Sequence, residues 1–308
     1  MSKFIFIFAL LTFLVTTVSA QNLMQPSRTK DNYSIPFHLT SYNNIVLKAV
    51  LNNRDTVNLM LHTASSDLAI TEDALRKLKT IKFDGAVDSV KSWGGSSNSS
   101  DFSKNNSLTI ANISWDSILI WKDKNSGKQT DGKFGLNLFE NKVLEIDFDR
   151  NLLTVKTKMP RKIIEYDKFQ LFTKNDEMFI KAICQTEKGS FANEFLLHSG
   201  YSGGVLLDDK FVNENNIAQQ INITGEKKLK DAFGNVLTTK NGTLPLFKIG
   251  RLQLANVPIA FFEGAIGRQK ISIIGGDILK RFNWIIDAKR QFIYLKPNNL
   301  FKTNFSNI

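Results

Sequence analysis

Residues 59–66 read LMLHTASS, and residues 195–202 read FLLHSGYS. In each stretch three apolar residues lead into a histidine, which is followed by a hydroxyl residue and then by a small residue. The two histidines, His62 and His198, are 136 positions apart. A recurrence of this kind predicts two related units within the chain.

A second set of blocks supports the duplication. It comprises a glycine block, an Ile-Asp pair and an arginine, at residues 135–137, 146–147 and 150 and again at residues 275–277, 286–287 and 290. These blocks are 140 positions apart and follow the histidine stretches in the same order. We therefore expect two copies of one unit of about 130 residues, a common domain size.

The apolar runs are short, rich in Val, Ile, Leu and Phe, and separated by Asn, Asp and Gly. This pattern predicts an all-β protein. The turn residues 52–55 predict a hairpin between the runs 45–51 and 57–61. Another hairpin is predicted over 143–155, and the amphipathic run 72–78 predicts a short helix.

Composition excludes several classes. With 308 residues, 42% hydrophobic and 22% charged, 6 Pro and one Cys, the chain is neither fibrous, nor disordered, nor a disulfide scaffold. The formal net charge is +11, but the basic residues are scattered, and even the pair Lys227-Lys228 lacks an accompanying nucleic-acid motif. We expect a solvated basic surface and no nucleic-acid partner.

The first twenty residues predict a secretory signal. Lys3 precedes an apolar run over 4–18, and the small residues Ser19 and Ala20 end it, so cleavage is expected after Ala20. No later apolar run reaches the roughly 20 residues of a membrane span. The processed protein is predicted to be secreted or periplasmic, without a membrane span.

The repeated blocks resemble the aspartic peptidases of the pepsin and retropepsin type, in particular bacterial proteins with two such units in tandem. The resemblance implies an all-β, bilobal, pepsin-like architecture. Two retropepsin-like β-barrel lobes, related by pseudo-twofold symmetry, would then span residues 35–158 and 165–297. Met159-Pro160-Arg161 would connect them, since Pro favours a connector.

The resemblance also implies roles for particular residues. In this family each lobe carries a D-T/S-G loop, a flap hairpin, and an apolar pair with glycine that threads behind the loop. The matching threading blocks are Phe134-Gly135 and residues 273–275. The residues implied to support the active loops are Thr63, Ala64, Ser65, Ser199 and Gly200. Among them, Thr63 and Ser199 keep the hydroxyls that cross-link the two loops in this family, and Ser65 keeps the outer hydroxyl that bonds the catalytic group of its loop. The residues implied at the cleft and flaps are Trp93, Gly94, Gly95, Phe233 and Gly234.

The chain departs from the family at the decisive position, because His62 and His198 stand where the family has its two catalytic Asp residues. Two neighbouring carboxylates share one proton and divide the roles of general acid and general base. Two neighbouring imidazoles instead disfavour the doubly charged state, so at least one ring is expected to be neutral near pH 7. Ala64 and Tyr201 replace a family glycine and a family hydroxyl.

Two functions remain open. The first is an impaired homologue, a pseudo-peptidase, that binds a peptide or protein segment in extended conformation in the interlobe cleft and needs no cofactor. The alternative is an active peptidase or another hydrolase that uses the His62/His198 pair. The pair would act either alone or together with a metal ion held by the same two residues. His38 is the one further imidazole in the sequence and is expected in an early strand.

Three other features have simpler explanations. Residues 200–204 read GYSGG, which fits the G-x-S-x-G elbow of α/β-hydrolases, but no His follows Ser202. Cys184 lies in an apolar run and is expected to be a buried, inert thiol. Asp147 and Asp287 end matching strands and are expected to stabilise turns, with nearby arginines as partners.

Overall fold

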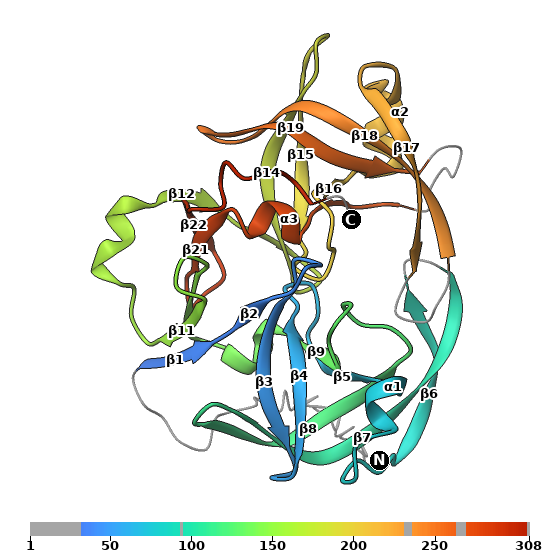
Figure 1. Ribbon diagram of the computed structural model, residues 1–308, viewed down its shortest axis with the longest axis vertical. Coiled ribbons are helices and arrows are strands. Elements are labelled where there is room, and N and C mark those ends of the chain that lie inside the picture. Colours follow the sequence, from blue (N-terminus) through green and yellow to red (C-terminus); the bar gives the residue numbers. More distant parts are fainter. Residues whose placement is uncertain (1–31, 93–94, 231–235, 263–268, 307–308) are drawn as a thin grey trace, which may run out of the picture.

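The computed structural model describes residues 32–92, 95–230, 236–262 and 269–306, and their strands form three sheets (Figure 1). Two sheets contain eight strands each, and a third contains six. The helices within this part of the chain are at most six residues long. The predicted all-β class is confirmed.

The first eight-stranded sheet lies in the N-terminal half. Its strands are β2 (His38–Leu39), β3 (Ile45–Leu51), β4 (Asp55–Leu61), β5 (Leu68–Thr71), β6 (Gly85–Ser92), β7 (Gly95–Ile110), β8 (Ile113–Asp123) and β9 (Gly132–Phe134). They are ordered β2-β3-β4-β9-β5-β8-β7-β6. The predicted hairpin β3–β4 is confirmed, and its turn residues Asn52 and Asn53 adopt left-handed φ angles of 49° and 56°, which asparagine tolerates.

The second eight-stranded sheet repeats this arrangement. Its strands are β13 (Phe172–Lys174), β14 (Glu177–Gln185), β15 (Ser190–Leu197), β16 (Val205–Leu206), β17 (Asn222–Lys230), β18 (Val236–Ile249), β19 (Leu252–Phe261) and β20 (Ser272–Ile274). The order β13-β14-β15-β20-β16-β19-β18-β17 matches the first sheet strand for strand. The additional pairings β3–β7 and β14–β18 also correspond. The predicted duplication is therefore present in the topology.

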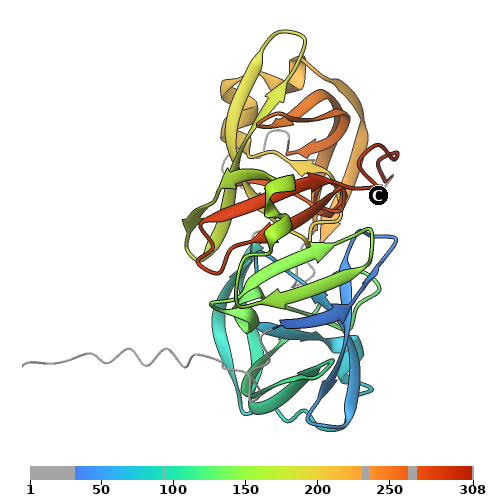
Figure 2. The same ribbon diagram turned by 90° about the vertical axis from the view of Figure 1, so that its left-hand side faces the viewer.

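The six-stranded sheet joins the two halves (Figure 2). Its strands are β1 (Asn32–Pro36), β10 (Val143–Asp147), β11 (Leu152–Lys156), β12 (Asp167–Gln170), β21 (Phe282–Ile286) and β22 (Phe292–Pro297). At its centre β10 pairs with β21, with Leu144 opposite Ile286 and Ile146 opposite Trp284. At the repeat spacing of 140, Leu144 corresponds to Trp284 and Ile146 corresponds to Ile286, so the two pairs are equivalent. A local twofold axis thus passes through the centre of this sheet, as the bilobal prediction requires.

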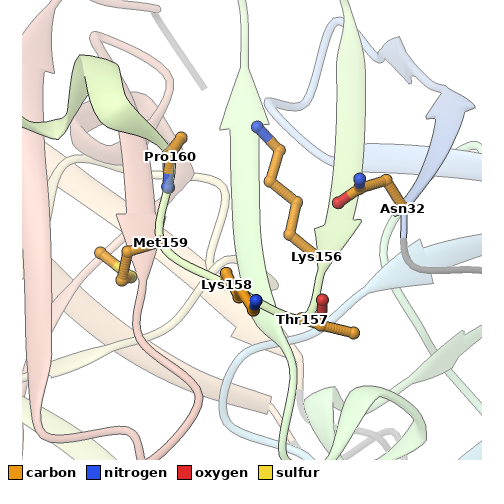
Figure 3. Close-up of a pocket in the computed structure, with 6 residues that line it drawn as sticks. All are labelled: Asn32, Lys156, Thr157, Lys158, Met159 and Pro160. Atoms are coloured by element: carbon orange, nitrogen blue, oxygen red, sulfur yellow. The ribbon is translucent and has the colours of Figure 1, made fainter.

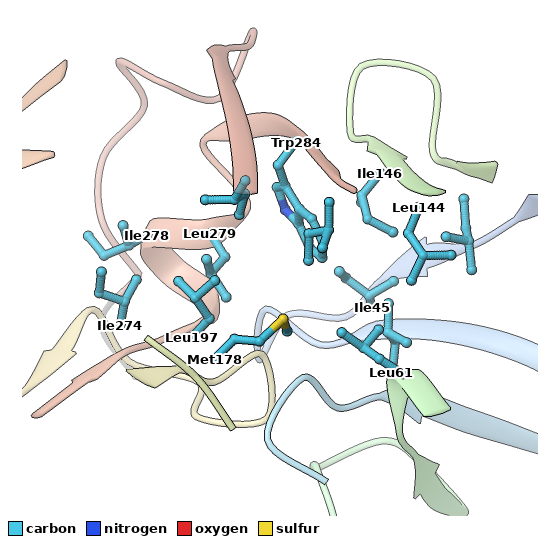
Figure 4. Packing of buried hydrophobic residues seen from close by; sticks show 14 of the residues in the cluster. Ile45, Leu61, Leu144, Ile146, Met178, Leu197, Ile274, Ile278, Leu279 and Trp284 are labelled. Carbon is cyan, nitrogen blue, oxygen red and sulfur yellow. The ribbon is translucent and has the colours of Figure 1, made fainter. Parts of the chain in front are cut away.

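One continuous apolar core runs through both halves. Figure 4 shows side chains of the two halves side by side near the central sheet. Leu61, Leu144 and Ile146 come from the first half, and Leu197 and Trp284 from the second, each with 2% or less of its surface exposed. Complete burial of such a side chain stabilises the fold by about 1.5–3 kcal/mol. The core therefore fixes the lobes relative to each other.

The helices are short. They are α1 (Glu72–Leu75), α2 (Asp209–Glu214) and α3 (Gly276–Leu279), with 3-10 turns η1 (Leu136–Phe139), η2 (Arg161–Glu165) and η3 (Ile217–Gln219). The prediction of a helix over 72–78 was too long. Thr71 caps α1 by accepting from the Ala74 N–H, but the Asp55 carboxylate takes the N–H groups of Lys79 and Thr80 and draws the chain away from the helix.

The predicted signal, residues 1–20, lies outside the described residues. Among the residues that are described, no helix is long and apolar enough to cross a membrane. Cys184 is fully buried in β14, and burial raises the pKa of its thiol, in agreement with the expected inert role.

Candidate functional site

His62 and His198 directly follow the central strands β4 and β15. The backbone N–H of His62 donates to the Phe134 carbonyl over 2.9 Å, and that of His198 donates to the Ile274 carbonyl over 3.0 Å. These bonds extend the parallel pairings β4–β9 and β15–β20 by one residue. Each histidine is therefore held at the end of a buried strand.

The structure brings the two imidazoles together. Their ring centroids are 4.6 Å apart, and the ring planes are inclined by 60°. His62 is 8% exposed, and His198 is half-buried. Two residues 136 positions apart thus form one polar pair where the lobes meet.

Burial governs the protonation of this pair. Desolvation lowers the pKa of His62 well below its ordinary value, and repulsion from His198 and Lys133 lowers it further. Desolvation lowers the pKa of His198 to about 4, with Lys133 acting in the same direction. A buried imidazolium is disfavoured in a medium of low polarity. Both rings are therefore neutral at pH 7.

Thr63 and Ser199 link the two loops symmetrically. The Thr63 N–H donates to Ser199 Oγ, and the Ser199 N–H donates to Thr63 Oγ1, each over 3.0 Å. Thr63 Oγ1 donates to the Leu197 carbonyl over 2.5 Å, and Ser199 Oγ donates to the Leu61 carbonyl over 2.6 Å. Each hydroxyl thus acts as donor and acceptor across the interface, and the four bonds fix the separation of the histidines.

The threading blocks pass directly behind the active loops. A Cβ on Gly135 would overlap the backbone of Ser65, and a Cβ on Gly275 would overlap the backbone of Tyr201 and Gly203. The Gly276 N–H donates to the Tyr201 carbonyl over 2.7 Å. Glycine is required at both positions because two backbone segments touch there.

Ala64 and Gly200 follow the cross-link in their loops and contact the imidazole pair differently. The Ala64 N–H donates to His62 Nδ1 over 3.2 Å. Neutral His62 therefore carries its proton on Nε2. Gly200 lies beneath the same ring, since a Cβ placed there would be 2.5 Å from His62 Nε2. Both residues thus orient His62.

The expected role of Ser65 needs a correction. The resemblance implied that its hydroxyl bonds the group at position 62, but Ser65 Oγ donates to the Asp67 carbonyl over 3.3 Å. The physical reason is that His62 Nδ1 already accepts the Ala64 N–H. In the second loop, Tyr201 packs its ring against Gly203 and Gly275, and burial raises the pKa of its phenol.

Of the five residues predicted at the cleft and flaps, Gly95 alone lies in the described part of the chain. Gly95 begins β7 and pairs with Ser92 of β6. Trp93 and Gly94 lie outside the described residues, as do Phe233 and Gly234 between β17 and β18. Figure 1 shows the β6–β7 and β17–β18 hairpins on the same side of the molecule.

A metal site has little support from the described residues. No group of three or more His, Cys, Asp or Glu side chains among them is arranged to hold a metal ion. His38 is exposed in β2. Zinc sites use at least three protein ligands, so the two imidazoles by themselves make an incomplete set.

The strand-end aspartates stabilise turns, as predicted. Asp147 accepts from the Arg150 N–H over 3.0 Å, and Asp287 accepts from the Phe292 N–H over 2.6 Å. Arg150 also pairs with the Asp147 carboxylate over 3.9 Å, and Arg290 contacts Asp287 by donating to its main-chain carbonyl over 3.2 Å. Arg290 has further partners in the other half. Its guanidinium donates to the carbonyls of Phe139 and Lys142, because the β10–β21 contact brings the first half within reach.

A separate surface pocket of about 450 Å³ lies at the connector (Figure 3). It is lined by Asn32, Lys156, Thr157, Lys158, Met159 and Pro160. None of these residues belongs to the loops of His62 and His198. Lys156 is already engaged by Glu145 over 2.7 Å. The pocket is therefore not part of the candidate site.

Sequence reasoning missed two residues of the site. Lys133, on β9, influences both imidazoles while its Nζ lies 2.6 Å from Asp123 Oδ2. Its counterpart at the repeat spacing of 140 is Ile273, so comparison of the blocks could have indicated it. Asn43, which contacts the loop of His198 from the other half, left no signal in the repeat.

Comparisons with known proteins agree with this fold. No family model matches the sequence, and no curated protein matches it. Among solved structures, the chain is similar to the crystal structure of aspartic proteinase from Irpex lacteus, with a TM-score of 0.58. The match covers 90% of this chain and 100% of that chain at 14% identity. At this identity the similarity establishes the bilobal, pepsin-like fold alone.

Proposed function

We propose that this protein is an exported, catalytically impaired homologue of the aspartic peptidases, a pseudo-peptidase that binds an extended peptide or protein segment between its lobes. His62 and His198 would occupy the positions of the two catalytic Asp residues. The observation that carries the proposal is the pair of imidazoles, 4.6 Å apart, on a cross-linked pepsin-like scaffold. Neither ring supplies the acidic proton that a carboxyl pair would share.

The fold also supports the binding part of the proposal. The hairpins β6–β7 and β17–β18 place edge strands on one side of the molecule, and β6 and β17 are the outermost strands of their sheets. The free edge of a strand can pair with an extended peptide through main-chain hydrogen bonds. Such binding requires no catalytic carboxylate.

A second candidate function is hydrolysis by the imidazole pair, with or without a metal ion. The observation in its favour is His198 Nδ1, a buried nitrogen with no hydrogen-bond partner in the described part of the chain. In such a route a neutral imidazole would take a proton from the attacking water, and the His198 loop would have to open before water could reach the buried Nδ1.

Fluorescein-labelled casein, an unfolded protein, tests both functions on residues 21–308. We expect saturable binding by fluorescence anisotropy and no cleavage between pH 3 and 8, with or without added zinc. Ser66 is exposed in the first active loop, so Ser66→Trp should weaken binding, whereas Thr157→Trp, at an exposed residue just after β11, should not. Absence of casein binding would contradict the binding proposal.

The double variant His62→Asp/His198→Asp tests the impaired chemistry. We expect it to cleave casein at acid pH, because it restores two carboxylates on the same scaffold. Cleavage by the parent protein that disappears in His62→Ala would instead establish the second candidate function. The elemental content of the purified parent protein then shows whether that route uses a metal.

A further inference from the structure

Residues 298–306, which follow β22, form no strand but are held tightly by one side chain. The guanidinium of Arg281, with 1% of the residue exposed, donates to four carbonyls of this segment. These carbonyls belong to Leu300, Phe301, Thr303 and Asn304, at 3.1, 3.3, 2.7 and 3.1 Å. Phe305 also packs its ring 3.7 Å from the guanidinium carbon. The segment is therefore anchored along its whole length.

The end of this segment reaches a buried carboxylate and an ammonium. The Ser306 N–H donates to Asp277 Oδ2 over 2.7 Å. Lys280 Nζ contacts Asp277 Oδ1 over 2.8 Å and also donates to Ser306 Oγ over 2.9 Å. Charged, buried hydrogen bonds of this kind are stronger than neutral ones. Ser306 and Lys280 thus form a single polar cluster at α3.

The same cluster extends into the other half of the molecule. Lys280 Nζ donates to Asn43 Oδ1 over 2.8 Å, and Ser306 Oγ lies 3.2 Å from the same oxygen. Asn43 is 3% exposed and adopts a left-handed φ of 63° in the turn before β3. A Cβ on Gly276 would lie 2.7 Å from the Asn43 carbonyl oxygen, so the two backbones are in close contact.

Asn43 in turn holds the loop of His198. Its Nδ2 donates to the Ser202 carbonyl over 2.7 Å. Ser202 lies four residues after His198, and the Tyr201 N–H closes the turn between them by donating to the His198 carbonyl over 3.1 Å. A continuous series of contacts therefore links Ser306 to the loop that carries one imidazole.

The first half lacks this cluster at the corresponding described positions. At the repeat spacing of 140, Asp277, Lys280 and Arg281 correspond to Asn137, Glu140 and Asn141. These residues cannot reproduce a buried arrangement of one carboxylate and two cations. The loop of His62 is thus built without the support that the loop of His198 receives.

We propose that Asn43 is a positioning residue, and that residues 298–306 act through it as a clasp that holds the His198 loop in register with His62. The clasp fixes Asn43 Oδ1, and Asn43 Nδ2 fixes the Ser202 carbonyl. Loss of the clasp loosens the His198 loop and admits water to the imidazole pair. An extended segment that lies over the imidazole pair is then bound more weakly. This last expectation rests on the proposed function.

Asn43→Gly tests this directly, because glycine tolerates the left-handed φ and removes the side chain that makes both contacts. The matched control is Asn175→Gly, which changes an exposed asparagine with φ 49° in the corresponding turn of the second half. NMR titration of the imidazole protons should show the His198 pKa rising from about 4 by about half a unit or more in Asn43→Gly, and unchanged in the control.

Ser306→Ala should raise the His198 pKa by a smaller amount. If Asn43→Gly does not fold, an unchanged His198 pKa in Ser306→Ala would overturn the proposal. A folded Asn43→Gly protein with an unchanged His198 titration would overturn the proposal. Casein binding about threefold or more weaker in Asn43→Gly than in Asn175→Gly is the second expected result. If the parent protein binds no casein, the proposed function fails, while the titration still decides the role of Asn43.

Discussion

The loops of His62 and His198 share one backbone plan but differ in what surrounds each ring. His62 accepts an N–H from its own loop and rests on Gly200 of the other half. His198 has an Nδ1 without a partner in the described residues, and its loop is held by Asn43. The comparison shows that duplication preserved the cross-linked scaffold, where symmetry has a structural use, and that the environments of the two imidazoles diverged.

The largest loss of stability is expected at the Thr63–Ser199 cross-link, which is the symmetric part of the two loops. Ser199→Ala leaves the Thr63 N–H and the Leu61 carbonyl buried without their partners, and Thr63→Val does the same to the Ser199 N–H and the Leu197 carbonyl. Each unsatisfied group costs about 1–3 kcal/mol, so each variant should lose about 4 kcal/mol of unfolding free energy.

Urea unfolding measures both losses, with Thr154→Val on the half-buried β11 as a control that should change stability by less than about 1 kcal/mol. If the losses of unfolding free energy in the two cross-link variants differed by more than about 2 kcal/mol, the two hydroxyls would not contribute equally to stability, despite their symmetric geometry.

The next effect concerns the protonation of the imidazole pair. The native pKa of His198 is about 4, against 6.5 in the unfolded chain, and that of His62 is lowered as well. Below pH 6.5 the unfolded chain therefore binds protons that the native protein does not, so stability falls as the pH decreases toward 4. His198 alone accounts for about 3 kcal/mol of this loss.

The difference between the parent protein and His198→Asn isolates that contribution, because the carboxylates titrate alike in both. Urea unfolding at pH 7.5 and at pH 4.5 should show a clearly smaller loss in His198→Asn, while His38→Asn, at an exposed imidazole, should behave like the parent. Equal losses in all three proteins would show that the imidazole is not buried in solution.

The repeat predicted the scaffold because each of its parts leaves a local mark. An apolar strand before His62 and His198, a glycine where two backbones touch, and Asn52-Asn53 in a left-handed turn each follow from short-range chemistry. The Thr63–Ser199 link was implied by the resemblance and is present as hydrogen bonds.

The surroundings of the rings left no such mark. The contact of Asn43 with Ser202 joins residues 159 positions apart in different halves, and it depends on how the lobes pack. The hydroxyl of Ser65 turns to Asp67 because the Ala64 N–H already occupies His62 Nδ1, a competition that only three-dimensional geometry decides. Trp93 and Phe233 remain predicted flap residues outside the described part of the chain.

The smallest effect separates the two residues that touch His62. Gly200→Ala places a Cβ 2.5 Å from His62 Nε2, so the ring or the loop has to move, at a cost of about 2 kcal/mol. Ala64→Gly removes a methyl group and creates no clash. It lowers the unfolding free energy by about 0.5–1 kcal/mol, because glycine loses more backbone entropy on folding. Gly200→Ala should also move the His62 imidazole resonances in NMR spectra, and Ala64→Gly should leave them nearly in place. The opposite ranking would mean that the ring of His62 does not rest on Gly200, and the asymmetry between the two loops would then have to lie in Asn43 and the clasp alone.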